Sequence, residues 1–123
     1  MSAILLPLTA GGAVDWDAFA AHVARTLDAG LAPAVNMDTG YVQIIDASTR
    51  TEALRITQEL CAGRRYVAGA FVADAPGDPF DHDAYLAAMT EITAAGGTPV
   101  VFPSWGLHGT DEIEWVDAQH RLG

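Results

Sequence analysis

Residues 36–41 place several reactive side chains directly after an apolar run. The hydroxyl of Thr39 and the backbone N–H groups around Gly40 can hold a substrate carboxylate, because glycine lets the chain approach a ligand closely. Asp38 belongs to the same predicted substrate-binding loop, and Tyr41 can either donate a proton or pack. Since Asp, Thr and Gly are also common turn formers, a tight turn without a ligand is the alternative interpretation.

Residues 103–109 form a second segment of this kind, again after an apolar run. We expect Ser104 and Trp105 to contact a substrate there. Histidine is the side-chain type that most often transfers protons in enzymes, so His108 is the best acid–base candidate together with Tyr41. The alternative for His108 is a surface histidine that only hydrogen-bonds. The other histidines are weaker candidates because of their positions on predicted helices or near the end of the sequence: His22, His82 and His120.

Four apolar runs have the length of β-strands, and helical patterns lie between them. The runs are continuously apolar rather than alternating, as in parallel sheets whose two faces are both covered. The predicted strands are residues 3–8, 31–36, 66–72 and 98–102. The first predicted helix covers residues 15–29, and a fourth is expected to begin near Thr110. The apolar stripes of the three helices between the strands are Trp16, Phe19, Val23 and Leu27; Ala53, Ile56 and Leu60; and Tyr85, Met89 and Ile92.

A weak internal repeat relates residues 14–19 to residues 80–85. In each copy the first aspartate, Asp15 or Asp81, can cap a helix, and the apolar residue before it can pack on the aromatic residue four positions into the helix. These aspartates also suggest metal ligands or an acid–base pair, but capping explains their position. Further capping-box candidates are Thr49 with Glu52 and Asp111 with Glu114, with Asp46 as another start for the second helix.

The alternating order of strands and helices predicts an α/β fold with a parallel sheet. We expect the first half of a (β/α)₈ TIM barrel, with about four parallel strands and three to four helices, and residues 1–123 as the N-terminal half of a single barrel domain. A whole barrel takes about 250 residues. Gly11 and Gly12 lack the glycine spacing of a dinucleotide-binding loop, so that class is disfavoured.

The charge balance of the sequence restricts the partners. Six arginines and no lysine stand against 16 acidic residues, giving a net charge of −10, so neither nucleic acid nor a membrane surface is an expected partner. Cys61 is the only cysteine, and no zinc-ligand spacing occurs, so we expect no metal and no cofactor. The apolar start is broken at Pro7 and follows no basic residue, which predicts no signal peptide and a cytoplasmic location.

The sequence resembles the dihydrodipicolinate synthase/N-acetylneuraminate lyase family of barrels over nearly its whole length. The likeness is carried by residues 5–16, the Thr39-Gly40 loop, residues 67–70 and residues 100–103. It implies a class I aldolase-like lyase that acts on a small carboxylate or 2-oxo acid and forms a homo-oligomer when full length. The Schiff-base lysine of the family comes from the sixth strand, outside these residues, so this chain alone is expected to be inactive.

The residues also depart from the pattern of that family. Only Thr39 and Gly40 match its carboxylate-binding loop, where Asp38 would repel a substrate carboxylate unless it is protonated or paired. Ser104 and Trp105 stand where the family has a proton-relaying tyrosine, a task that Tyr41 or His108 would have to take over. Two alternatives are therefore a non-catalytic barrel that serves as a ligand-binding or interaction scaffold, and a metal-dependent isomerase or aldolase with Asp38 and His108 as ligands.

Overall fold

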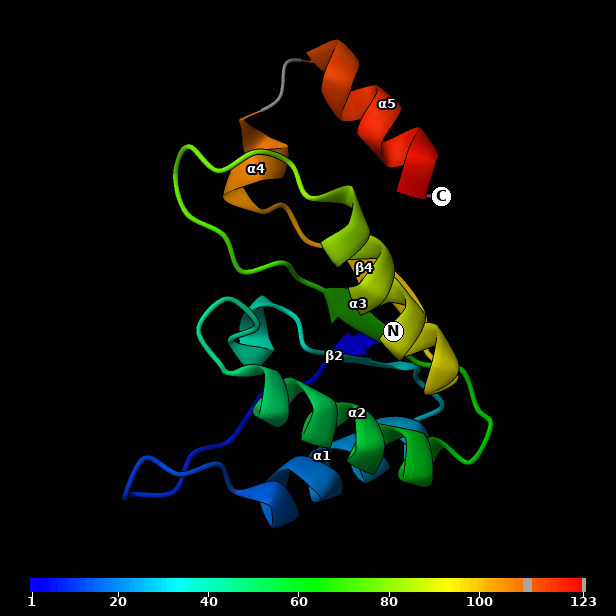
Figure 1. Cartoon of the computed structure of the whole chain (residues 1–123). Helices are drawn as coiled ribbons and strands as arrows, with labels where there is room; N and C mark the ends of the chain where they lie inside the picture. Colours follow the sequence, from blue (N-terminus) through cyan, green and yellow to red (C-terminus); the bar gives the residue numbers. More distant parts are fainter. Residues whose placement is uncertain (110–111, 123) are drawn as a thin grey trace.

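The computed structural model describes residues 1–109 and 112–122, and their strands form one parallel sheet in the order β1-β2-β3-β4 (Figure 1). The predicted helix start at Thr110 and the capping box at Asp111 lie outside the described residues. The strands are β1 (Ser2–Ala3), β2 (Pro33–Val35), β3 (Val67–Ala70) and β4 (Thr98–Val101). The helical segments are α1 (Trp16–Asp28), the 3-10 turn η1 (Asp38–Gly40), α2 (Ala47–Cys61), α3 (His82–Ala94), α4 (Trp105–His108) and α5 (Glu112–Leu122).

The strands are shorter than the apolar runs that predicted them. β1 shows this most clearly, because residues 3–8 were expected to form a strand and only Ser2–Ala3 pairs in register with β2. Beyond Ile4, whose N–H donates to the carbonyl of Ala34 at 2.9 Å, the chain leaves the sheet, and Leu8 forms an antiparallel bridge with Val14 instead. Pro7 has no N–H to offer a ladder, which favours this departure.

Aspartate caps start the three long helices that follow β1, β2 and β3. Asp15 and Asp81 accept the N–H groups of Ala18 and Ala84, each at 2.9 Å, so the capping predicted from the repeat is confirmed. Asp46 caps α2 by accepting the N–H of Thr49 at 2.7 Å. The capping box predicted to start this helix at Thr49 is therefore wrong, since α2 begins at Ala47.

Helices α1, α2 and α3 lie on one face of the sheet (Figure 1). Aromatic and aliphatic side chains from these helices and from the strands form the core. The stripe predicted for α2 packs on the core, although Ile56 and Leu60 are only half-buried there. Thr57 is buried in the core, where its hydroxyl is satisfied by donating a hydrogen bond to the carbonyl of Ala53 at 2.7 Å. The buried face of α2 consists of Ala53, Leu54, Thr57 and Cys61.

A second, smaller cluster lies at the β4 end of the sheet. It joins Tyr85 of α3, Leu107 of α4 and Ala118 of α5, all of them buried. Phe80, the residue before the cap of α3, stacks at 5.7 Å between ring centroids on Tyr85, as the repeat predicted. This cluster fixes α4, a four-residue helix in the segment that was expected to be a loop. No helix among those described is long and apolar enough to cross a membrane.

Candidate functional site

The segments that leave the four strands gather at one edge of the sheet (Figure 1). A cavity of about 520 Å³ opens there, at the carboxyl ends of β3 and β4. Active sites of parallel α/β folds lie at this edge. Its lining comes from three segments: Gln43 after η1; Phe71, Ala73 and Asp74 after β3; and Pro103, Ser104, Trp105 and His108 after β4. Three of the predicted site residues, Ser104, Trp105 and His108, thus share one cavity.

Asp74 joins the segment after β3 to the helix after β4. Its two carboxylate oxygens accept the backbone N–H groups of Trp105 at 2.8 Å and of Gly106 at 2.7 Å. Desolvation by burial opposes ionisation, but the hydrogen bonds from Gly106, Ser104 and Trp105 outweigh it and lower the pKa of Asp74. Asp74 is therefore a carboxylate at neutral pH, and it holds α4 in place from the wall of the cavity.

Ser104 forms the buried floor of the cavity. Its hydroxyl oxygen accepts the N–H of Leu107 at 3.2 Å and so caps α4. The same residue lies within hydrogen-bonding reach of both Asp74 and Tyr85. Tyr85 is fully buried and donates its hydroxyl to the carbonyl of Phe102 at 2.5 Å. Burial raises the pKa of Tyr85, so a neutral phenol supports Ser104 from behind.

Trp105 and His108 lie at the rim of the cavity, on α4. The indole of Trp105 is 56% exposed although the backbone beneath it is fixed by Asp74. His108, at the last position of this helix, is also exposed. Both side chains are therefore accessible to a ligand that enters the cavity.

The predicted loop at residues 38–41 does not line this cavity. Thr39 donates its hydroxyl to the carbonyl of Ile4 at 3.2 Å, and the N–H of Gly40 donates to the carbonyl of Met37 at 2.8 Å, so both predicted carboxylate donors already have partners. Asp38 accepts a hydrogen bond from the amide of Gln43, and through Gln43 this turn reaches the cavity.

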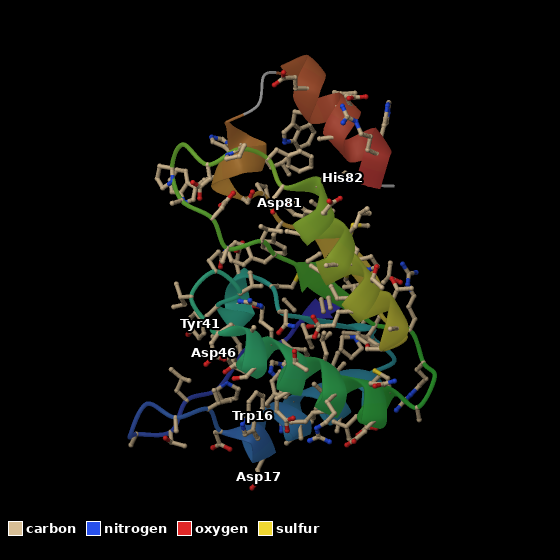
Figure 2. The ribbon with its side chains drawn as sticks, in the orientation of Figure 1. Trp16, Asp17, Tyr41, Asp46, Asp81 and His82 are labelled. Atoms are coloured by element: carbon tan, nitrogen blue, oxygen red, sulfur yellow. The ribbon has the colours of Figure 1, made fainter. Side chains whose placement is uncertain are left out.

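Tyr41 lies apart from His108. It has a left-handed backbone conformation, with φ of 58°, and its side chain lines a separate hollow formed by residues 5–8 and α1. Figure 2 shows Tyr41 at the η1 turn, away from α4. The two predicted acid–base residues therefore do not share one cavity.

Two residues of the site, Asp74 and Tyr85, were missed by the sequence analysis as functional residues. Asp74 lies in a segment that follows a strand, which was the available signal, but its partners are 31 and 32 positions away along the chain. Tyr85 was assigned to an apolar stripe, where its hydroxyl gave no separate signal. Across the described residues, no group of three or more His, Cys, Asp or Glu side chains is arranged to hold a metal ion.

The fold is that of the dihydrodipicolinate synthase-type TIM barrels, over part of their length. A protein assigned as a dihydrodipicolinate synthetase from Pseudomonas aeruginosa superimposes with a TM-score of 0.79 at 18% identity, covering 98% of this chain and 40% of that one. Dihydrodipicolinate synthases from Bacillus clausii and Oceanobacillus iheyensis give TM-scores of 0.75 and 0.72 at 17% and 18% identity. Each of these two alignments covers 98% of this chain. They cover 39% of the Bacillus clausii protein and 38% of the Oceanobacillus iheyensis protein.

The chain thus spans about 40% of the length of the solved structures that it matches. At 17–18% identity the likeness establishes the fold. It confirms the predicted α/β class and the predicted resemblance to this kind of barrel as statements about the fold. Comparisons of the sequence with models of protein families and with well-characterised proteins find no match.

Proposed function

We propose that this chain forms the N-terminal half of a barrel lyase that acts on a 2-oxo acid through a Schiff base. The observation that carries the proposal is the cavity at the carboxyl ends of β3 and β4, lined by Ser104, Trp105 and His108. In this fold class the loops at that edge bind the substrate. The lysine would come from sequence outside these 123 residues, since the chain contains none.

In the proposed reaction, the lysine amine adds to the 2-oxo carbonyl and water leaves, which produces an imine that can accept the electrons of a cleaved carbon–carbon bond. His108 is the proposed acid–base group, because it is exposed at the cavity rim and an imidazole can both donate and accept a proton. Ser104 would hold a proton or a substrate oxygen at the floor. Thr39 and Gly40 would orient the carboxylate, with the substrate replacing the 3.2 Å hydrogen bond from Thr39 to Ile4.

Reductive trapping tests this proposal. A gene product that extends beyond Gly123 is incubated with pyruvate and borohydride, and the modified peptide is identified by mass spectrometry. We expect one modified lysine in the extension. The 123-residue chain, whose only amine is at Met1, is the matched control and should give no lysine adduct. A folded, extended protein that gives no adduct would refute the Schiff-base mechanism.

A second candidate is a barrel scaffold that binds a ligand at this cavity without catalysis. It is favoured by the engagement of Thr39 and Gly40 within the chain, which leaves these two predicted donors occupied. Ligand binding in the extended protein without any adduct would support the scaffold over the lyase.

A further inference from the structure

Trp105 presents an exposed indole from a fixed backbone. An exposed aromatic side chain is not unusual in itself, but this one sits at a cavity rim. The carboxylate of Asp74 accepts the backbone N–H groups of Trp105 and Gly106, and Ser104 caps the same helix. The helix is also seated closely on the preceding loop, because a Cβ added at Gly106 would lie 2.5 Å from the carbonyl oxygen of Pro79.

Other apolar surfaces face the same cavity. Phe71 is half-buried in its wall, and the guanidinium of Arg50 lies 5.9 Å from the centre of its ring. Pro103 adds a third apolar surface at the end of β4. Flat aromatic rings stack favourably on such surfaces, with an indole offering the largest area.

The charge in the cavity argues against an anionic occupant at this place. The carboxylate of Asp74 is among the lining residues, whereas neither arginine nor lysine is. Arg50 lies behind Phe71 and donates to the carbonyl of Ile45 at 2.7 Å. A substrate carboxylate beside Asp74 would be repelled. Gln43, Ser104 and His108 can instead hydrogen-bond an uncharged substituent.

We infer that the cavity holds an uncharged aromatic ring, stacked on Trp105 and lying beside Phe71, at the end of the substrate remote from the carboxylate. The inference deepens the proposed function, on which the 2-oxo acid part of the ligand rests. The inference that the cavity binds a ring depends only on the residues that line the cavity. A substrate of this class is an aryl-substituted 2-oxo acid, or an aldol adduct of one.

The test uses two probes with the 123-residue chain, phenylpyruvate and pyruvate, and follows the three indole N–H signals by ¹⁵N-edited NMR. We expect phenylpyruvate to bind at least about tenfold more tightly than pyruvate, because its ring leaves water. The signal of Trp105 should move, and those of Trp16 and Trp115 should not.

Variants separate the subsite from general apolar binding. Trp105→Ala should weaken phenylpyruvate binding about tenfold, while Trp105→Phe should retain most of it. Trp115→Ala is the matched control, since Trp115 is exposed on α5 and does not line the cavity. Equal affinity for the two probes, or an equal loss in Trp115→Ala, would overturn the inference.

Benzyl alcohol, a neutral ring without a 2-oxo acid, separates this inference from the proposed function. A shift of the Trp105 signal by benzyl alcohol supports the subsite even if reductive trapping fails. Successful trapping in the extended protein, combined with no preference for the ring, would overturn the subsite alone. Much tighter binding of benzylammonium than of benzyl alcohol would show that the occupant is a cation and would also overturn it.

Discussion

The carboxylate of Asp74 accepts the backbone N–H of Trp105 at 2.8 Å, across 31 residues of chain. This contact joins the ends of two neighbouring strands and places Trp105 at the rim of the cavity. Because Asp74 contacts the backbone of Trp105 and not its ring, Asp74 determines where the indole lies and leaves its chemistry unchanged.

Replacement of Asp74 should loosen α4. In Asp74→Ala the N–H groups of Trp105 and Gly106 lose their acceptor, and we expect a loss of about 1 kcal/mol in the free energy of unfolding, discounted because Asp74 is only partly buried. Hydrogen exchange at these two amides should accelerate more than exchange within α2. Unchanged exchange at both amides would contradict this role.

The same contact predicts a pH dependence of stability. Folding lowers the pKa of Asp74 below the ordinary value of an aspartate, because the hydrogen bonds from Gly106, Ser104 and Trp105 outweigh desolvation by burial. The ionised form of Asp74 therefore stabilises the folded chain. This contribution is complete above the pKa that Asp74 has in the unfolded chain, and it is lost as the pH falls through the lower pKa that Asp74 has in the folded chain. Denaturant unfolding between about pH 6 and pH 2 should therefore show a shallower acid loss in Asp74→Asn than in the parent. Parallel curves would count against it.

Tyr85 and Tyr66 form a matched pair for testing the support of the site. Both are buried and donate to a backbone carbonyl, Tyr85 to Phe102 at 2.5 Å and Tyr66 to Ala95 at 2.7 Å. Either Phe substitution should cost about 1 kcal/mol, since a half-buried carbonyl loses its donor. Only Tyr85→Phe should also shift the amide signals of Ser104 and Leu107. Equal shifts of these signals in Tyr66→Phe would show that Tyr85 has no special relation to the site.

The paired aspartates at the helix starts should behave as caps. Asp15→Ala and Asp81→Ala should each lower the free energy of unfolding by about 1 kcal/mol, whereas the Asn variants should stay close to the parent. Thermal unfolding measures both effects. A large loss in the Asn variants, or one that depends on added divalent cation, would indicate a role other than capping.

Local chemistry made part of this structure predictable. A cap depends on residues three positions apart, so the repeat was sufficient to locate the starts of α1 and α3. Strand length depends on the register with a neighbour, which is why residues 3–8 were too long a prediction for β1. The buried face of α2 escaped because Thr57 and Cys61 do not count as strongly apolar, although the Thr57 hydroxyl is satisfied within the helix.

The site was predictable only in its broad location. The loop rule found the segments after β2 and β4, and with them Ser104, Trp105 and His108. It could not assign Asp74 its partners, because they lie far along the chain. The rule also could not show that Tyr41 and His108 line different hollows. The direction of the Tyr41 side chain depends on the left-handed backbone at that residue. Helix α4 has four residues, too few to produce a helical period.

If the cavity at the ends of β3 and β4 binds the substrate through its aromatic ring, the amides around that cavity must respond to an aryl 2-oxo acid. Mapping backbone amide shifts at saturating phenylpyruvate tests this binding most directly. We predict that the largest shifts fall on Gln43, Asp74, Ser104 and His108. Shifts confined to the hollow beside Tyr41, or spread evenly over the chain, would contradict the claim.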